Sequence, residues 1–191
     1  ASCASSGSGC YTEYADSVTM ITAADGADCV NPTDLNSPNS VFFSGNYYNP
    51  YAGAGAIDYG VDSEQSRHTV CTDTTARDPR TGGQLRMVPE GYTSSVRLGN
   101  WSTNPSDPEA EGVIYSLFVD TANFQLLLLH YAAVLQDPMH APEDQPRFRL
   151  ELLDSNFAPI DPDCSSADFV ANQSLGWNTA ADGVLWKDWT S

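Results

Sequence analysis

Positive charge is scarce in this sequence. Only 8 of its 191 residues are Lys or Arg, against 25 Asp and Glu, which gives a formal net charge of −17 at pH 7, and Lys187 is the single lysine. Proteins that bind nucleic acids or anionic membranes use clusters of Lys and Arg to neutralise phosphate groups. The composition therefore argues against nucleic acid as a partner and against binding to a charged lipid surface.

Long apolar runs and cysteine-based metal motifs are also missing. No segment has the roughly 20 consecutive apolar residues that a membrane-spanning helix needs. No CxxC pair or Cys/His spacing indicates zinc or redox chemistry. The first residue is small and is not Met, and this start together with widely spaced cysteines predicts an extracellular setting with disulfide bonds. The disulfide candidates are Cys3, Cys10, Cys29, Cys71 and Cys164, an odd number that leaves one thiol over.

What the sequence does contain is a series of short strand patterns. In residues 147–152 (RFRLEL) charged and apolar residues alternate, which places Phe148, Leu150 and Leu152 on a core face. The apolar run 124–135 lies one loop before them and is the nearest available partner strand, so we expect these two segments to pair. Further strands are predicted at 17–22, 41–43, 67–71, 94–98, 113–119 and 184–189, with a short apolar piece at 169–170.

Strands at short spacing, with turn residues between them and no long amphipathic helix, predict an all-β fold, an antiparallel β-sandwich. We expect segment 113–119 to pair with 124–135 through the short turn between them. Residues 1–40 would form an N-terminal segment with a first strand and a turn region. Residues 41–191 would form the sandwich module of what is a single domain.

The loop after the apolar run carries a dense group of titratable side chains. Asp137, His140, Glu143 and Asp144 lie within a few residues of one another. Calcium prefers several carboxylate and carbonyl oxygens, so Asp137, Glu143 and Asp144 are candidate ligands of a structural Ca²⁺. Alternatively, these side chains bind the loop's own backbone and pair with Arg147. No nucleophile or zinc motif accompanies His140 or Glu143, which argues against a hydrolase.

Aromatic residues offer a possible surface for sugar rings. Residues 45–60 (GNYYNPYAGAGAIDYG) form either an irregular loop packed by its own aromatics or a binding platform made of Tyr47, Tyr48, Tyr51 and Tyr59. The four tryptophans (Trp101, Trp177, Trp186, Trp189) are further candidates for stacking on sugars, and for Trp186 and Trp189 we expect instead that they help to fill the sandwich. His68 and His130 fall inside predicted strands, where a hydrogen-bonded structural histidine is expected. Acidic turns such as Asp107, Glu109 and Glu111 lack the spacing of an EF-hand.

Three segments together resemble a known family. They are RHTVCTD (67–73), DPRTGGQLRMVPEGYTSSVRLGN (78–100) and YAAVLQDPMHAPEDQPRFRLELLD (131–154). They resemble a β-sandwich module of very large secreted, adhesin-like proteins of Bacteroidota, which often carry PKD-type repeats and a sorting signal for type IX secretion or gliding-motility association. The resemblance spans residues 41–190.

The resemblance implies a jelly-roll-like sandwich with long irregular loops, at the cell surface. It also implies a non-enzymatic, structural or adhesive role in a surface adhesin or an extracellular filament. The partners would then be neighbouring subunits, further domains of the same protein or surface glycans. The alternative is a carbohydrate-binding module that uses the Tyr-rich tract.

Two further expectations come with the resemblance. Similar exported proteins carry O-glycans at Asp-Ser/Thr followed by a small or aliphatic residue, which makes Ser17, Thr74 and Thr121 candidate acceptors. Relatives also continue past the tract VLWKDWTS with more strands and with a cysteine that would pair with Cys164. We therefore expect an open edge beside the strand 184–189, filled by more of the same chain or by a strand from a neighbouring subunit.

Overall fold

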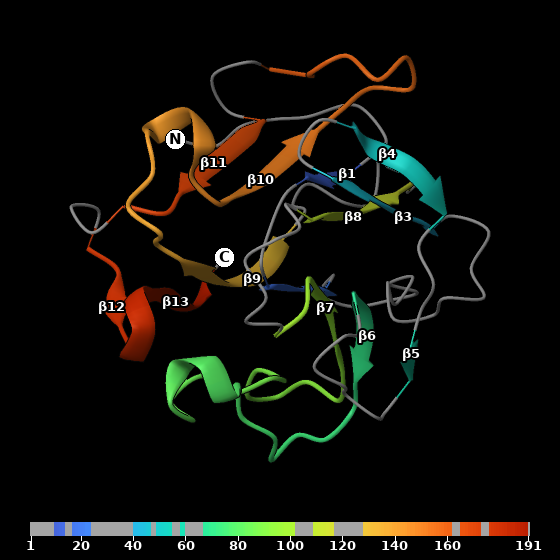
Figure 1. Cartoon of the computed structure of the whole chain (residues 1–191). Coiled ribbons are helices and arrows are strands. Elements are labelled where there is room, and N and C mark those ends of the chain that lie inside the picture. Colours follow the sequence, from blue (N-terminus) through green and yellow to red (C-terminus); the bar gives the residue numbers. More distant parts are fainter. Residues whose placement is uncertain are drawn as a thin grey trace.

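The protein folds into β-sheets joined by long loops (Figure 1). The computed structural model describes residues 10–13, 17–23, 40–46, 49–54, 58–59, 67–101, 109–116, 128–161, 165–172 and 176–190. All strand pairs in this described part are antiparallel except the short pair β5 and β6, which is parallel. The predicted all-β, antiparallel class is confirmed. No helix among the described residues is long and apolar enough to span a bilayer.

The strands form two sheets, named here after a central strand of each. The β8 sheet has the order β11-β10-β1-β8-β3-β4, and the β9 sheet has the order β12-β13-β9-β2-β7-β6-β5. The strands of the β8 sheet are β1 (Cys10–Glu13), β3 (Ser40–Asn46), β4 (Asn49–Ala54), β8 (Glu109–Tyr115), β10 (Arg147–Leu152) and β11 (Ser166–Val170). Those of the β9 sheet are β2 (Ser17–Ala23), β5 (Asp58–Tyr59), β6 (His68–Cys71), β7 (Ser95–Leu98), β9 (Leu128–Gln136), β12 (Asn178–Thr179) and β13 (Val184–Thr190).

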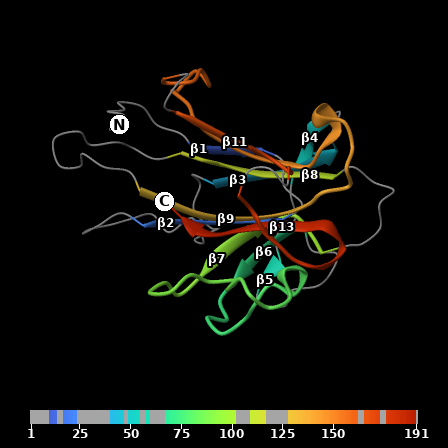
Figure 2. The same cartoon turned by 90° about the vertical axis from the view of Figure 1, so that its left-hand side faces the viewer.

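The two sheets lie as layers over a shared hydrophobic core (Figure 2). Phe42, Val113 and Phe148 come from the β8 sheet, and they pack in one cluster with side chains from β7, β9 and β13, namely Val96, Leu98, Ala133, Leu135 and Leu185. Burial of apolar surface between two inner faces is the main stabilising term of such an arrangement. The architecture is therefore sandwich-like, while the jelly-roll description stays a prediction.

Strand β9 is buried on both faces, which explains why its sequence is apolar without alternation. Its residues Ala133 and Leu135 face the shared core, whereas Ala132 and Val134 pack on the outer side against Leu85. Leu85 belongs to the connection between β6 and β7, residues 72–94, which we call the covering segment because it packs over the outer face of the β9 sheet. It contains the short 3₁₀ helix η1 (Pro79–Thr81). The sequence of a strand that is covered on both faces is a continuous apolar run.

The predicted pairing of segment 124–135 with 147–152 is wrong. Strand β9 pairs with β2 and β13, and β10 pairs with β1 and β11 in the other sheet. The predicted pairing of 113–119 with 124–135 is also wrong, since β8 pairs with β1 and β3. At both connections the chain crosses from one layer to the other. Hydrophobic alternation identifies which residues face the core, but it carries no information about which sheet a strand joins.

Both sheets contain strands from the first 40 residues. Cys10 of β1 lies opposite Leu152 on one side and Tyr115 on the other, so β1 joins β10 to β8. Strand β2 lies between β9 and β7 in the same way. The sequence prediction included β2 but missed β1, because residues 1–10 are small and polar and the strand itself has only 4 residues.

The buried Phe148 provides a test of the shared core. Its ring stacks on Phe169 at a centroid distance of 5.8 Å and lies 5.4 Å from Tyr131. We expect Phe148→Ala to lower the free energy of unfolding by about 3–5 kcal/mol, because it leaves a cavity between the sheets. Phe157→Ala removes an identical ring that is 68% exposed, and it should change stability by less than about 0.5 kcal/mol. Urea denaturation of both variants measures the difference, and equal losses would contradict the assigned core.

Candidate functional site

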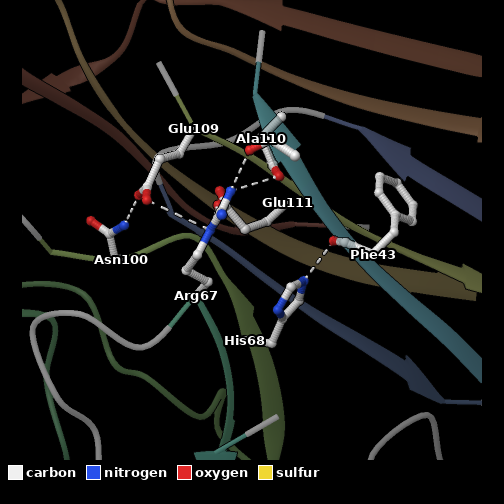
Figure 3. Close-up of polar contacts among 8 residues, drawn as sticks. Phe43, Arg67, His68, Asn100, Glu109, Ala110 and Glu111 are labelled. Atoms are coloured by element: carbon white, nitrogen blue, oxygen red, sulfur yellow. Dashed lines mark hydrogen bonds and ion pairs between the residues drawn. The ribbon is translucent and has the colours of Figure 1, made fainter. Parts of the chain in front are cut away.

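Arg67, the residue before β6, joins the two sheets through its guanidinium group (Figure 3). Its Nε donates to the carboxylate of Glu111 on β8, and the two groups form an ion pair. Its Nη2 donates to the backbone oxygens of Gly45 at 2.7 Å and Ala110 at 3.0 Å. Glu111 is buried, with only 2% of its surface exposed. One cation therefore contacts both β3 and β8, and we call Arg67 and Glu111 the inter-sheet ion pair.

His68, the next residue, makes a second bond between the layers. Its Nε2 lies 2.9 Å from the backbone oxygen of Phe43 on β3, as Figure 3 shows. Because a carbonyl oxygen only accepts hydrogen bonds, Nε2 carries the proton in this contact. The ring is fully buried and meets Phe42 edge-on at a centroid distance of 5.5 Å. His68 is thus the structural strand histidine that its position predicted.

Glu109 and Asn100 lie at the exposed rim of the inter-sheet ion pair. Glu109 is 3.8 Å from Arg67 Nε, and Asn100 Nδ2 donates to its carboxylate. The sequence prediction placed Glu109 and Glu111 in an acidic turn before a strand at 113–119, and this is wrong because β8 begins at Glu109. Arg67 and Glu111 are 44 positions apart in the sequence. No local pattern signals a contact over that separation.

A second buried polar cluster lies under the covering segment. Arg97 of β7 is fully buried; its Nη2 donates to Thr69 Oγ1 at 3.1 Å, and its guanidinium lies 4.2 Å from the centre of the Trp101 ring. Trp101 Nε1 in turn donates to Asp78 Oδ2 at 3.1 Å. A guanidinium over an indole face gains a cation–π interaction. Trp101 therefore packs on a protein cation in this structure, and this use of its ring was not predicted.

Asp78 connects this cluster to the covering segment. Its Oδ1 accepts a hydrogen bond from the backbone N–H of Thr81 at 3.0 Å and so caps η1. Burial raises the pKa of Asp78 above its usual value of 3.8, and the hydrogen bonds from Thr81 and Trp101 and the charge of Arg97 oppose this rise. An acid with a raised pKa in the folded state costs stability when it ionises. The contribution of Asp78 to stability therefore falls as pH rises from 3.8 through the raised pKa.

The loop that carries the calcium candidates is tied by its own side chains. Asp137 Oδ1 accepts hydrogen bonds from Met139 N at 2.8 Å and Gln145 Nε2 at 2.9 Å. Gln145 Nε2 also donates to the backbone oxygen of His140 at 3.2 Å. Asp144 is exposed and ends the short 3₁₀ helix η2 (Pro142–Asp144). The interpretation that Asp137 binds the loop's own backbone is confirmed.

The other half of that interpretation, an ion pair between the loop and Arg147, stays a prediction. The Nη1 of Arg147 lies 3.7 Å from Asp168 Oδ2 on the neighbouring strand β11. Within the described part of the chain, no three His, Cys, Asp or Glu side chains lie close enough together to hold a metal ion. The side chain of Glu143 lies outside the described residues. Calcium binding by Asp137, Glu143 and Asp144 stays a prediction, which chelation tests below.

The tyrosine candidates are distributed over two sheets. Tyr51 belongs to β4, the edge strand of the β8 sheet, and Tyr59 belongs to β5, the edge strand of the β9 sheet. Tyr47 and Tyr48 lie outside the described residues. The expectation of an irregular loop over 45–60 is wrong where β4 and β5 form. Of the tryptophan candidates, Trp186 is buried in a hydrophobic cluster, which agrees with its expected packing role. Trp177 is buried as well, in the shared core, whereas the sequence makes it a candidate for stacking on sugars.

The cysteine candidates lie mostly outside the described residues. Cys71 is described: it is buried on β6, and its Sγ lies 4.0 Å from the backbone oxygen of Thr69. The structure thus gives Cys71 a packing contact under the covering segment and no disulfide. Cys10 lies on β1, and Cys3, Cys29 and Cys164 are not among the described residues.

The three glycosylation candidates differ in their surroundings. Thr74 is exposed in a turn of the covering segment. Ser17 begins β2 and pairs with Val134 of β9. Thr121 is outside the described residues. Thr74 therefore has the accessible side chain that a modifying enzyme needs.

Comparison of the chain with protein-family models, with curated proteins and with solved structures gave no match. The functional argument therefore depends on the geometry of the side chains alone.

The inter-sheet ion pair has a matched control on the same strand. Glu111→Gln removes the buried charge that neutralises Arg67, and we expect it to lower the free energy of unfolding by about 2–4 kcal/mol. Glu109→Gln makes the same chemical change at the exposed rim and should cost less than about 0.5 kcal/mol. Thermal and urea unfolding at neutral pH measure both. A loss from Glu109→Gln that matches the loss from Glu111→Gln would contradict the structural role of the buried pair.

Substitution of Asp137 separates the stabilising effect of the loop's hydrogen bonds from that of bound calcium. Asp137→Ala removes two hydrogen bonds and should lower stability by about 1–2 kcal/mol in EDTA, where no calcium is present. If the three carboxylates also hold Ca²⁺, added calcium chloride raises the melting temperature of the wild-type chain by mass action and has no such effect on Asp137→Ala. A melting temperature of the wild-type chain that is equal in EDTA and in calcium rules out the calcium site.

Proposed function

We propose that this chain is a non-enzymatic, extracellular β-module with a structural or adhesive role at a cell surface. The proposal is based on what the buried charged and histidine side chains contact. Among the described residues the buried His, Asp, Glu and Arg side chains are Glu111, His68, Asp78 and Arg97, and each of them contacts another part of the fold. Catalytic groups with perturbed environments normally face a cleft where a substrate binds. Here these groups connect layers of the fold.

The sheet edges distinguish an adhesive module from a strand-exchanging filament. Open edges lead to pairing with other chains unless prolines, charges, bulges or short strands block them. Edge strand β4 contains Pro50, and edge strand β5 has 2 residues. Edge strand β11 carries Asp168, whose side chain is 43% exposed and pairs with Arg147. These features favour a module that does not polymerise through its edges.

The edge beside the last strand is also partly protected. The resemblance to the adhesin-like module leads us to expect an open edge beside the strand 184–189. Strand β12 pairs with Leu185 and Trp186 of β13, and the register of β13 against β9 shifts between Lys187 and Thr190. A bulge of this kind twists an edge away from regular pairing. Strand donation at this position therefore has less support than an adhesive role through loops or faces.

Removal of one edge charge tests this choice. We expect the wild-type chain to sediment as a monomer over a wide range of concentration, because each described edge carries a blocking feature. Asp168→Val removes the charge from β11 and should cause concentration-dependent association. Asp161→Val, in an exposed loop position, makes the same substitution away from an edge and should stay monomeric. Filaments formed by the wild-type chain would instead support the filament version of the role.

The carbohydrate-binding alternative has its own discriminating result. Glycan-array binding that is lost in both Tyr47→Ala and Tyr51→Ala, with unchanged melting temperatures, would favour a platform in the Tyr-rich tract. Surface attachment that persists in both variants supports the structural or adhesive role without that platform.

A further inference from the structure

The covering segment forms a pocket on the outer side of the β9 sheet, away from the inter-sheet ion pair. Its volume is about 470 Å³, and its lining includes Arg77, Arg86, Glu90 and Tyr92. Pockets that bind small molecules have volumes of roughly 300–1,000 Å³ and a few convergent polar groups. The pocket is therefore large enough for a ligand of one or two sugar rings.

The two arginines of the pocket lie directly opposite each other in the backbone. Arg77 and Arg86 form an isolated antiparallel bridge. Side chains at directly opposed positions of an antiparallel pair project from the same face within about 5.5 Å at Cβ, and like charges there are destabilising. The chain has 25 acidic residues, yet within its described part neither guanidinium forms an ion pair with a carboxylate. The local geometry thus places two positive charges side by side at one depression of a strongly acidic protein, with Glu90 as the acidic residue of the lining.

The other basic residues of the chain are mostly engaged elsewhere. Arg67 pairs with Glu111, and Arg97 is buried against Trp101. Arg147 and Arg149 pair with carboxylates of their own sheet, and the Lys187 ammonium lies over the rings of Phe169 and Trp177. The concentration of charge at Arg77 and Arg86 is therefore a local feature of the pocket.

The walls of the pocket are held in place by hydrogen bonds within the covering segment. Arg77 Nη1 donates to the backbone oxygen of Gln84 at 2.8 Å, which fixes one guanidinium. Thr75 N donates to Asp73 Oδ1 at 2.8 Å, and Tyr92 N donates to the backbone oxygen of Pro89 at 3.2 Å. Preorganised groups lose little conformational entropy when a ligand binds. The backbone of the pocket and the Arg77 guanidinium are therefore in place before any ligand arrives.

The mixture of groups narrows the chemistry of the ligand. Guanidinium groups recognise carboxylates through paired hydrogen bonds. Glu90, also in the lining, would repel a simple anion but accepts hydrogen bonds from hydroxyl groups. The hydroxyls of Thr74 and Thr75 and the half-buried ring of Tyr92 suit the polar edge and the flat face of a sugar. A ligand with one carboxylate and several hydroxyls satisfies all of these groups together.

We propose that this pocket binds a carboxylated sugar, a uronic acid residue, with its carboxylate between Arg77 and Arg86. Glu90 and the threonine hydroxyls bind the sugar hydroxyls, and Tyr92 packs against the ring. The site is separate from the Tyr-rich tract, and it does not depend on the structural or adhesive role proposed above.

Titration of the purified chain with sodium glucuronate tests the site. The measurement is the change in amide NMR signals of the covering segment, at about 0.15 M salt so that the overall negative charge is screened. We expect saturable binding with a dissociation constant near 1 mM, typical of a single small polar ligand. Glucose, which lacks the carboxylate, and acetate, which lacks the hydroxyls, should each bind at least about tenfold more weakly.

Matched variants assign the binding to the two arginines. Arg86→Gln should weaken glucuronate binding by about tenfold without lowering the melting temperature, because it also relieves the repulsion between opposed charges. Arg80→Gln makes the same change of charge on η1, outside the pocket lining, and should leave binding unchanged.

Three results would overturn the proposal. One is the absence of saturation by glucuronate, and the second is equal weakening by Arg80→Gln and Arg86→Gln. The third is acetate binding as tight as glucuronate binding, which would reduce the pocket to a general anion site. Self-association of the wild-type chain that Arg86→Gln abolishes would show instead that acidic side chains of a second copy occupy the pocket.

Discussion

The contact between the Arg67 guanidinium and the buried Glu111 carboxylate determines how the two layers of this fold meet. A hydrophobic interface between sheets is not directional, and apolar side chains alone tolerate small slips of one layer over the other. A buried ion pair with additional backbone acceptors allows one arrangement, because a slip would leave a desolvated charge without its partner. His68, the next residue, adds a hydrogen bond to the same strand β3. Two adjacent residues of the chain thus set the alignment that the hydrophobic core then stabilises.

The covering segment turns a two-layered structure into one with part of a third layer. Because it packs on β9 and β13 through Leu85, both faces of the central strands of the β9 sheet are removed from water. Its buried polar side chains are linked by the chain of contacts from Arg97 through Trp101 to Asp78. The same connection contains the pocket with opposed arginines. A loop that must be rigid in order to protect the sheet is also a suitable frame for positioning ligand groups, because rigid surroundings hold side chains in fixed geometry.

The sequence was sufficient to predict the class of fold and most of the strands. Alternation in RFRLEL correctly placed Phe148 in the core, and the segments at 17–22, 67–71, 94–98 and 184–189 are strands. Strand partners were predicted wrongly, because proximity in sequence is a poor guide where each connection crosses between layers. The polar clusters were missed for a related reason. In the sequence Glu111 resembles a solvent-exposed loop residue, because its partner Arg67 is 44 positions away. The opposed positions of Arg77 and Arg86 are known only from the backbone bridge.

The position of β1 between β10 and β8 has a consequence for the order in which the chain folds. Strand β1 cannot pair with β10 until residues up to Leu152 have been synthesised. Strand β2 in the same way depends on β9. The chain loses conformational entropy when it closes loops over such separations, and the stabilising contacts form only afterwards. Folding of this topology is therefore slow compared with that of helical proteins. During synthesis, neither sheet is complete until the ribosome has released most of the chain. The N-terminal strands thus complete their pairing only after β9 and β10 have been synthesised.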